Sequence, residues 1–187
     1  MCRFIKSATD ASGWIDDDCN EFCFIGRSNV GKSSLINSMA KKKIAISSKT
    51  PGRTQLINFY SFKHFRIIDL PGYGYAKVSK DKHNELMAYI DLYISSRKNI
   101  FGVFQVCDIG VVTNDDKQAS QYIQKKFINH FVVLNKIDKI PKTLLKKRIN
   151  EIAKFLSIDE KKIILTSTKK NLGINDIYKK IHECAKI

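Results

Sequence analysis

The sequence has no long apolar stretch and is poor in glycine and proline. Its 187 residues include only 9 Gly and 3 Pro, which excludes a collagen-like or low-complexity chain. The longest nearly apolar run, residues 100–107, is far shorter than the roughly 20 residues of a membrane-spanning helix, and no long apolar segment follows basic residues near the N-terminus. We therefore expect neither secretion nor an integral membrane segment.

Cysteine pairing is also not favoured. The 5 Cys residues are odd in number and form no C-x-x-C motif. Reduced thiols in a cytosol-like compartment are the simplest interpretation. The 4 His residues are scattered along the chain, so surface or packing roles are favoured over metal ligation.

Basic residues are in clear excess, with 33 Lys+Arg against 18 Asp+Glu and a formal net charge of +15. Residues 139–187 carry 13 basic and 5 acidic side chains, whereas residues 1–20 carry 2 basic and 4 acidic ones. This asymmetry favours a polyanionic partner that contacts the C-terminal half. The alternative is a generally lysine-rich composition in which lysines only solvate helix faces.

Apolar runs bounded by turn residues alternate with amphipathic stretches, which is typical of a parallel sheet with crossover helices on both faces. About six strands and five or six helices are expected. The expected strands are 21–25, 103–106, 131–134 and 163–165, with a hairpin at 55–62 and 65–68. The expected helices are 32–39, 81–97, 115–126, 144–156 and 174–185.

The first 20 residues show little periodicity. A short edge strand near Trp14 is the one element that we expect there. We expect residues 21–187 to form a single domain.

A phosphate-binding motif lies between the first expected strand and helix. The segment 26–33, Gly-Arg-Ser-Asn-Val-Gly-Lys-Ser, matches G-x-x-x-x-G-K-[ST]. Its glycines allow the backbone N–H groups to wrap around phosphates beside the positive end of the helix. Lys32 would reach the β and γ phosphates, and the Ser33 hydroxyl would bind Mg²⁺.

The segment Asp69-Leu70-Pro71-Gly72 ends the second strand of the expected hairpin. Asp69 would hold the water shell of Mg²⁺, and the Gly72 amide could donate to the γ-phosphate. The order of this segment after the phosphate loop, with a hairpin between them, gives the short motif its weight.

Two later segments predict the identity of the base. In Asn135-Lys136-Ile137-Asp138, the carboxylate of Asp138 can accept from both N1–H and N2–H₂ of guanine, which adenine cannot match. Asn135 would either tie this loop to the phosphate loop or meet the N7 side of the base, and the Lys136 stem would cover the ring. The segment 166–169, Thr-Ser-Thr-Lys, would supply a backbone amide to the guanine oxygen.

In these motifs and their order, the sequence resembles the EngB family of small bacterial GTPases. The strings that carry the resemblance are 26–37 (GRSNVGKSSLIN), 49–60 (KTPGRTQLINFY), 69–76 (DLPGYGYA) and 166–173 (TSTKKNLG). It implies a three-layer P-loop NTPase fold, the Ras-like G domain, with a mostly parallel sheet and one antiparallel edge hairpin. It also implies a GTP-driven switch that assists assembly of the large ribosomal subunit and supports normal cell division.

The resemblance implies a site for GTP or GDP and Mg²⁺. Thr54 would ligate Mg²⁺ together with Ser33 and Asp69, the latter through water, and Lys32, Thr54 and Gly72 would serve hydrolysis. The residues expected at the nucleotide are Gly26, Arg27, Ser28, Asn29, Val30, Gly31, Lys32, Ser33, Ser34, Gly52, Arg53, Thr54, Gln55, Leu56, Asp69, Leu70, Pro71, Gly72, Asn135, Lys136, Asp138, Leu165, Thr166, Ser167 and Thr168.

The chain departs from the family pattern at two places. Asn135 stands where the family usually has Thr, and residues 109–112 (Ile-Gly-Val-Val) replace a basic stretch, which leaves the role of that loop open. In addition, Tyr73 occupies the position at which Ras-like enzymes place a water-orienting Gln, and a phenol cannot do this. We therefore expect slow hydrolysis, stimulated by a partner or by K⁺ near Asn29, with Arg53 as an alternative source of charge.

The expected partner is the large ribosomal subunit or its RNA, contacted through the phosphates by Lys146, Lys147, Arg148, Lys179 and Lys180. A monomer in the bacterial cytoplasm, with no DNA partner, is the simplest expectation, and an organelle of bacterial origin is the other compartment left open. Two further functions remain as alternatives. One is a phosphotransferase, for which no Arg-rich lid is visible, and the other is a GTP-dependent tether at the membrane or division septum.

Overall fold

In the described part of the chain, seven strands and five α-helices alternate largely as the apolar pattern predicts. The structure is a computed structural model that describes residues 2–45, 56–73 and 80–186. The strands are β1 (Arg3–Ala8), β2 (Glu21–Gly26), β3 (Ile57–Ser61), β4 (Arg66–Asp69), β5 (Ile100–Asp108), β6 (His130–Asn135) and β7 (Ile163–Leu165). The helices are α1 (Lys32–Ala40), α2 (Lys80–Ser96), α3 (Asn114–Lys126), α4 (Lys142–Leu156) and α5 (Ile174–Ala185). Three short 3-10 turns, η1 (Ala11–Gly13), η2 (Ile137–Lys139) and η3 (Glu160–Lys162), join them.

The strands form one sheet in the order β1-β3-β4-β2-β5-β6-β7. Neighbouring strands from β4 to β7 are parallel, and β3 runs antiparallel to both β1 and β4. The mostly parallel sheet with its antiparallel part at one edge is thus confirmed. The expected edge element near Trp14 is misplaced, because the edge strand is β1 and it covers the outer side of the β3–β4 hairpin. Trp14 instead packs its ring edge against Tyr93 of α2.

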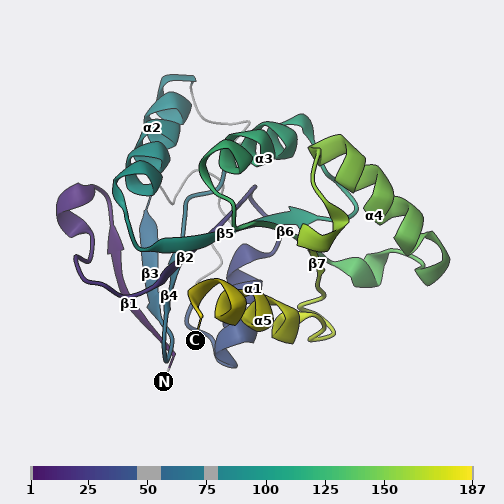
Figure 1. The fold of residues 1–187 in the computed structure, drawn as a ribbon, viewed down its shortest axis with the longest axis horizontal. Helices are drawn as coiled ribbons and strands as arrows, with labels where there is room; N and C mark the ends of the chain where they lie inside the picture. Colours follow the sequence, from purple (N-terminus) through teal and green to yellow (C-terminus); the bar gives the residue numbers. More distant parts are fainter. Residues whose placement is uncertain (1, 46–55, 74–79, 187) are drawn as a thin grey trace.

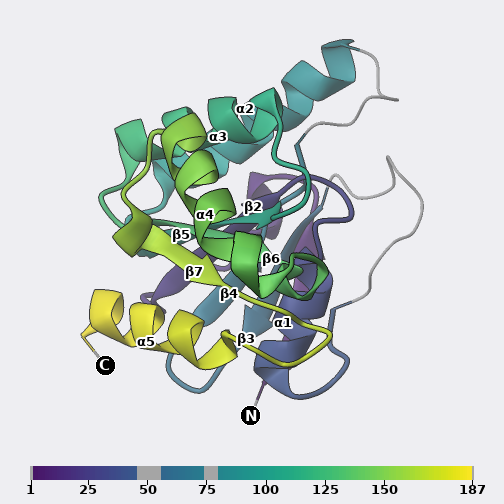
Figure 2. The same ribbon diagram turned by 90° about the vertical axis from the view of Figure 1, so that its right-hand side faces the viewer.

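Helices cover both faces of the sheet, with α1 and α5 on one face and α2, α3 and α4 on the other (Figures 1 and 2). Because successive side chains of a strand point to opposite faces, β2 supplies both layers. Phe22 and Phe24 pack in the cluster with α1 and α5, whereas Cys23 and Ile25 pack with α2 and α3. Strands that are buried on both faces explain the nearly continuous apolar runs in the sequence.

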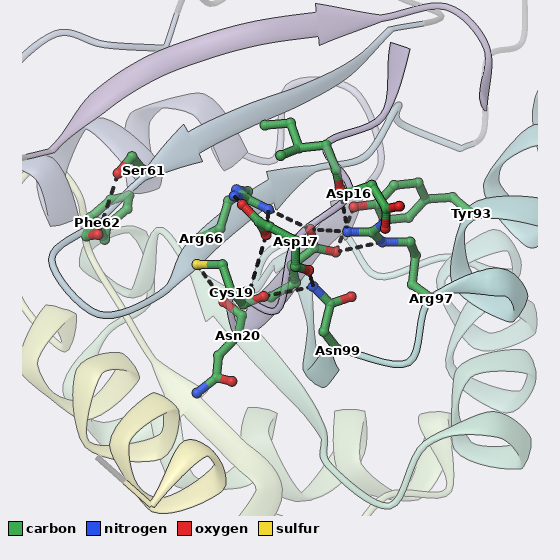
Figure 3. A network of polar contacts seen from close by, with 12 residues as sticks. Asp16, Asp17, Cys19, Asn20, Ser61, Phe62, Arg66, Tyr93, Arg97 and Asn99 are labelled. Carbon is green, nitrogen blue, oxygen red and sulfur yellow. Dashed lines mark hydrogen bonds and ion pairs between the residues drawn. The ribbon is translucent and has the colours of Figure 1, made fainter. Parts of the chain in front are cut away.

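The amino-terminal ends of the parallel strands are closed by a network of charged side chains (Figure 3). Glu21 is fully buried at the start of β2, and its carboxylate accepts from Arg66 Nη1 and Arg97 Nη2, each at 2.9 Å. Arg66 also binds Asp17 through both terminal nitrogens, at 3.1 and 2.6 Å. The N-terminal segment is therefore tied to β2, β4 and the end of α2.

The carboxyl-terminal ends of the same strands converge on the opposite edge of the sheet. There β2 ends at Gly26, β4 at Asp69, β5 at Asp108 and β6 at Asn135. In open α/β sheets, ligands bind outside this edge. The predicted motif residues of the described segments follow these four strands and β7. No helix within residues 2–45, 56–73 and 80–186 has the length and apolar character needed to cross a membrane.

Candidate nucleotide-binding site

The phosphate loop has the strand–loop–helix setting that the sequence predicts, running from Gly26 at the end of β2 to Lys32 at the start of α1. Gly31 has a φ of +99°, and a Cβ there would lie 2.3 Å from Nδ2 of Asn135. A Cβ on Gly26 would lie 2.4 Å from the carbonyl oxygen of Val106. Both glycines are thus required by close approach, and the loop carries its N–H groups to the positive end of α1, where an anion is favoured.

Lys32 spans the space between the phosphate loop and the end of β4. Its Nζ donates to the carbonyl oxygen of Leu70 at 2.7 Å and forms an ion pair with Asp69. The two predicted phosphate-side motifs are therefore brought together. Leu70, Pro71 and Gly72 follow directly and are buried.

The donor set beside Lys32 suits a hard divalent cation. Ser33 offers a hydroxyl and Asp69, which is 6% exposed, offers a carboxylate, and Mg²⁺ prefers oxygen ligands of this kind. In the same loop, Oγ of Ser28 is buried with no hydrogen-bond partner in the described part of the chain. The residues present therefore fit a phosphate–Mg²⁺ ligand by their chemistry.

Asn135 and Lys136 fasten the base loop to the phosphate loop. Nδ2 of Asn135 donates to the carbonyl oxygen of Val30 at 3.0 Å, and its Oδ1 accepts from the Thr166 hydroxyl at 3.2 Å. Of the two roles left open for Asn135, the structure thus places its side chain as the tie between loops. Nζ of Lys136 donates to the carbonyl oxygen of Asn29 and to Asp108, both at 2.7 Å.

Asp108, which the motif analysis did not single out as a site residue, orients the Lys136 side chain. Burial pushes the pKa of Asp108 upward, but hydrogen bonds from Lys136 and from the Gly110 N–H outweigh it and hold that pKa below its ordinary value. The carboxylate of Asp108 therefore stays ionised and holds the Lys136 side chain in place.

Asp138 lies in η2, and its carboxylate accepts from the Ser167 hydroxyl at 2.5 Å. This hydrogen bond lowers the pKa of Asp138, so the group remains an acceptor at neutral pH. Ser167 itself is held by reciprocal backbone hydrogen bonds with Leu172. The base loop after β6 and the loop after Leu165 of β7 thus form one unit, with the Thr168 amide 3.4 Å from Oδ1 of Asn135.

Arg27 is placed differently from the other loop residues. It was expected at the nucleotide, but its Nε donates to the buried carboxylate of Asp116 at 2.9 Å and its Nη2 to the carbonyl oxygen of Val111 at 2.5 Å. The side chain of Arg27 therefore points to the loop after β5 and to α3. Residues 109–111 are held here by their backbone carbonyls, Val111 by Arg27 and the other two by Arg148.

Some predicted residues cannot be placed. Gly52, Arg53, Thr54 and Gln55 lie outside the described residues, and Leu56, which follows them, is partly exposed.

Three comparisons bear on this site. A family model described as a 50S ribosome-binding GTPase matches residues 21–136. A probable GTP-binding protein EngB from Malacoplasma penetrans strain HF-2 is 52% identical over 181 residues, covering 97% of both chains. The probable EngB of Mycoplasma genitalium is 42% identical over 181 residues, covering 97% of this chain and 95% of the relative.

A crystal structure of a probable GTP-binding protein EngB resembles the whole fold. It matches with a TM-score of 0.75 and 28% identity, covering 89% of this chain and 98% of the other.

Proposed function

The chain belongs to the EngB family of GTP-binding proteins, and we propose that it is a GTP-driven switch that assists assembly of the large ribosomal subunit. The observation that carries the nucleotide part is the unit of Asp138 and Ser167, which is linked through Asn135 to the phosphate loop. The description of the matching family model, a 50S ribosome-binding GTPase, supports the partner. A role in normal cell division would follow from the supply of ribosomes.

GTP binding would use two ends of one site. The N–H groups of residues 26–34 and the Lys32 ammonium would surround the phosphates, and Asp138 would accept from guanine N1–H and N2–H₂. Mg²⁺, when bound, would neutralise charge on the phosphates, held by Ser33 and Thr54 and, through water, by Asp69. The Gly72 N–H would donate to the γ-phosphate.

Hydrolysis is proposed to be slow. Tyr73 offers no amide to orient water, so a partner or a K⁺ ion near Asn29 would be needed for the full rate. Turnover of GTP measured in matched K⁺ and Na⁺ buffers, with and without ribosomal subunits, tests this. Equal rates in all four mixtures would contradict both forms of stimulation.

Docking on RNA is proposed to use the exposed lysines of α4 and of the turn before it, namely Lys139, Lys142, Lys146 and Lys147. Arg148 is less suited, because its Nε is held by the carbonyl oxygen of Ile109 at 2.9 Å. Lys179 and Lys180 lie on α5, on the other face of the sheet (Figure 2), and Lys180 pairs with Glu183. Contacts to phosphates would make binding steeply dependent on salt.

The experiment is co-sedimentation with large subunits in the presence of a GTP analogue or GDP, over a series of salt concentrations. We expect more pelleting with the analogue and a steep loss with salt, reduced in the variant Lys146→Ser/Lys147→Ser. The control variant Lys98→Ser/Lys125→Ser removes two exposed lysines at the amino end of the sheet. Equal pelleting with both nucleotides would contradict the switch, and binding to liposomes instead of subunits would favour a membrane tether.

A further inference from the structure

A fully buried carboxylate, Asp116, joins two segments of the nucleotide site. It lies in the first turn of α3, where its Oδ2 accepts from the Thr113 backbone N–H at 2.9 Å and completes a capping box. The same oxygen accepts from Nε of Arg27, the second residue of the phosphate loop, at 2.9 Å. Oδ1 accepts from the hydroxyl of Tyr73 at 3.0 Å. The carboxylate therefore links the start of the phosphate loop to the residue that follows Gly72.

The hydrogen bonds behind Tyr73 have only one consistent direction. Nε2 of Gln105 donates to the Tyr73 hydroxyl at 2.9 Å and to the backbone oxygen of Asp116 at 2.7 Å. Oε1 of Gln105 must then accept, and its partner is Nε2 of His130 at 3.1 Å. Since the Tyr73 oxygen already accepts from Gln105, its own hydrogen points to Asp116. Burial also raises the pKa of Tyr73 well above its ordinary value, so the phenol keeps this hydrogen.

The two ends of this path meet the nucleotide site by chain connectivity. Arg27 follows Gly26, and Tyr73 follows Gly72, while the Tyr73 side chain itself is 3% exposed and lies in the core with Leu70 and Leu86. The phenol therefore anchors this segment in the core, directly after the Gly72 backbone whose contact with the γ-phosphate is proposed above. A buried tyrosine with both of its hydrogen-bonding roles filled has no second position of similar energy within the core.

We propose that Asp116 and Tyr73 are positioning residues that hold the Gly72 N–H in register with the phosphate loop, so that the site distinguishes a triphosphate from a diphosphate. The inference rests on the proposed contact of Gly72 with the γ-phosphate. GDP lacks that phosphate, so its affinity does not depend on where Gly72 lies. A loosened Tyr73 leaves only a fraction of molecules with Gly72 in place, and the affinity for the triphosphate falls in proportion to that fraction.

The test compares affinities for GDP and a non-hydrolysable GTP analogue by calorimetry. For Tyr73→Phe we expect about a tenfold loss for the analogue and less than a twofold change for GDP, since the hydroxyl that donates to Asp116 and accepts from Gln105 is removed. The matched control is Tyr93→Phe, which removes a buried tyrosine hydroxyl that donates to Glu21 at 2.7 Å at the other end of the sheet. It should lower the melting temperature and leave the ratio of the two affinities unchanged.

A second variant guards against a purely structural effect. Asp116→Asn should lower the same ratio, and the double variant Tyr73→Phe/Asp116→Asn should lower it no further, because both changes break one path. GDP affinity reports that each variant is folded. The proposal is overturned by an unchanged ratio in Tyr73→Phe, by an equal change in Tyr93→Phe, or by additive losses in the double variant.

The failure of the proposed γ-phosphate contact would look different. In that case the wild-type protein would bind GDP and the analogue equally, and Gly72→Ala would alter neither affinity. A wild-type preference for the analogue that Gly72→Ala removes and Tyr73→Phe retains would overturn the positioning role alone.

Discussion

The two edges of the sheet each carry a buried polar network, but the two networks are built differently. At the amino-terminal edge, each carboxylate oxygen of Glu21 accepts two hydrogen bonds, from Arg66, from the Tyr93 hydroxyl and from two nitrogens of Arg97. At the carboxyl-terminal edge, Asp116 and Tyr73 form a single path between two loops. The first arrangement ties the N-terminal segment and the end of α2 to β2, whereas the second holds the segments that contain Gly26 and Gly72 together.

The difference follows from where each network sits. The amino-terminal network ties an N-terminal segment and the end of α2 to the start of β2, and nothing in it extends to the motif residues. The other network begins one residue from Gly26 and ends one residue from Gly72. Both carboxylates have several partners, so the two networks differ in the segments that they join: Glu21 joins structural elements, and Asp116 joins two segments of the candidate site.

The largest expected effect is on ligand binding with little effect on stability. Asp138→Asn replaces an acceptor by a group that donates toward guanine N1–H and N2–H₂, so GTP affinity should fall about a thousandfold through two charge-assisted hydrogen bonds. Xanthosine triphosphate, whose C2 oxygen accepts, should gain affinity in return. Competition calorimetry measures both. Unchanged GTP affinity would show that this carboxylate does not read the base.

The converse is expected at the amino-terminal edge. Glu21→Gln puts an amide hydrogen against arginine donors and removes the charge that compensates two buried guanidinium groups, so the free energy of unfolding should fall by about 4 kcal/mol. Urea unfolding measures this, and GDP affinity below the transition should change less than twofold. A loss of nucleotide affinity without loss of stability would contradict the assignment of stability to this edge and of nucleotide binding to the other.

The pH dependence of stability separates the two networks by their titratable members. Burial, and to a smaller extent the charge of Lys162, lowers the pKa of His130 from 6.5 to about 4, with Gln105 as the partner of its Nε2. In the unfolded chain His130 binds a proton below pH 6.5, whereas in the folded chain it binds one only near pH 4. Stability from this group is therefore complete above pH 6.5 and is lost by about 3 kcal/mol as the pH falls to 4.

His130→Gln provides the comparison for that prediction. Its unfolding free energy, subtracted from that of the wild-type protein at each pH, should leave a difference that declines between pH 6.5 and 4. A flat difference over this interval would mean that the imidazole is not held neutral by its surroundings.

What the sequence alone could predict depends on whether an element is set by a local pattern or by distant residues. Helix α5 was predicted with its observed bounds because Ile174, Ile177 and Ile181 form an apolar stripe, and all three are buried. The edge strand of the first 20 residues was expected near Trp14 and is β1 at Arg3–Ala8, because four of its six residues are exposed and no alternation marks its position. Its place is set by pairing with β3, which is far away in the sequence.

The candidate site likewise combines local motifs, which the sequence predicts, with long-range contacts, which it does not. Gly31, Lys32, Asn135 and Asp138 stand in contiguous motifs whose chemistry is local, and the structure brings their segments together. Asp116 stands in no motif, and its partner Arg27 is 89 residues away, so only the folded chain reveals the contact. Arg27 itself was assigned to the nucleotide because neighbours in a motif share a loop, although their side chains need not share a direction.

The smallest predicted effects concern Asp17 and Asp16, two exposed carboxylates of the amino-terminal network, and their contributions to the free energy of unfolding. Asp17 receives both terminal nitrogens of Arg66, and its side chain is 45% exposed, so Asp17→Ala should lower the free energy of unfolding by about 1 kcal/mol. Asp16 meets Arg97 only at 3.9 Å and is fully exposed, so Asp16→Ala should produce no measurable change. Urea unfolding of the two variants in one buffer makes the comparison. Equal losses would show that proximity to an arginine, rather than desolvation and paired geometry, determines how much each carboxylate stabilises the fold. The assignment of Glu21 as the centre of this network would then have to be abandoned.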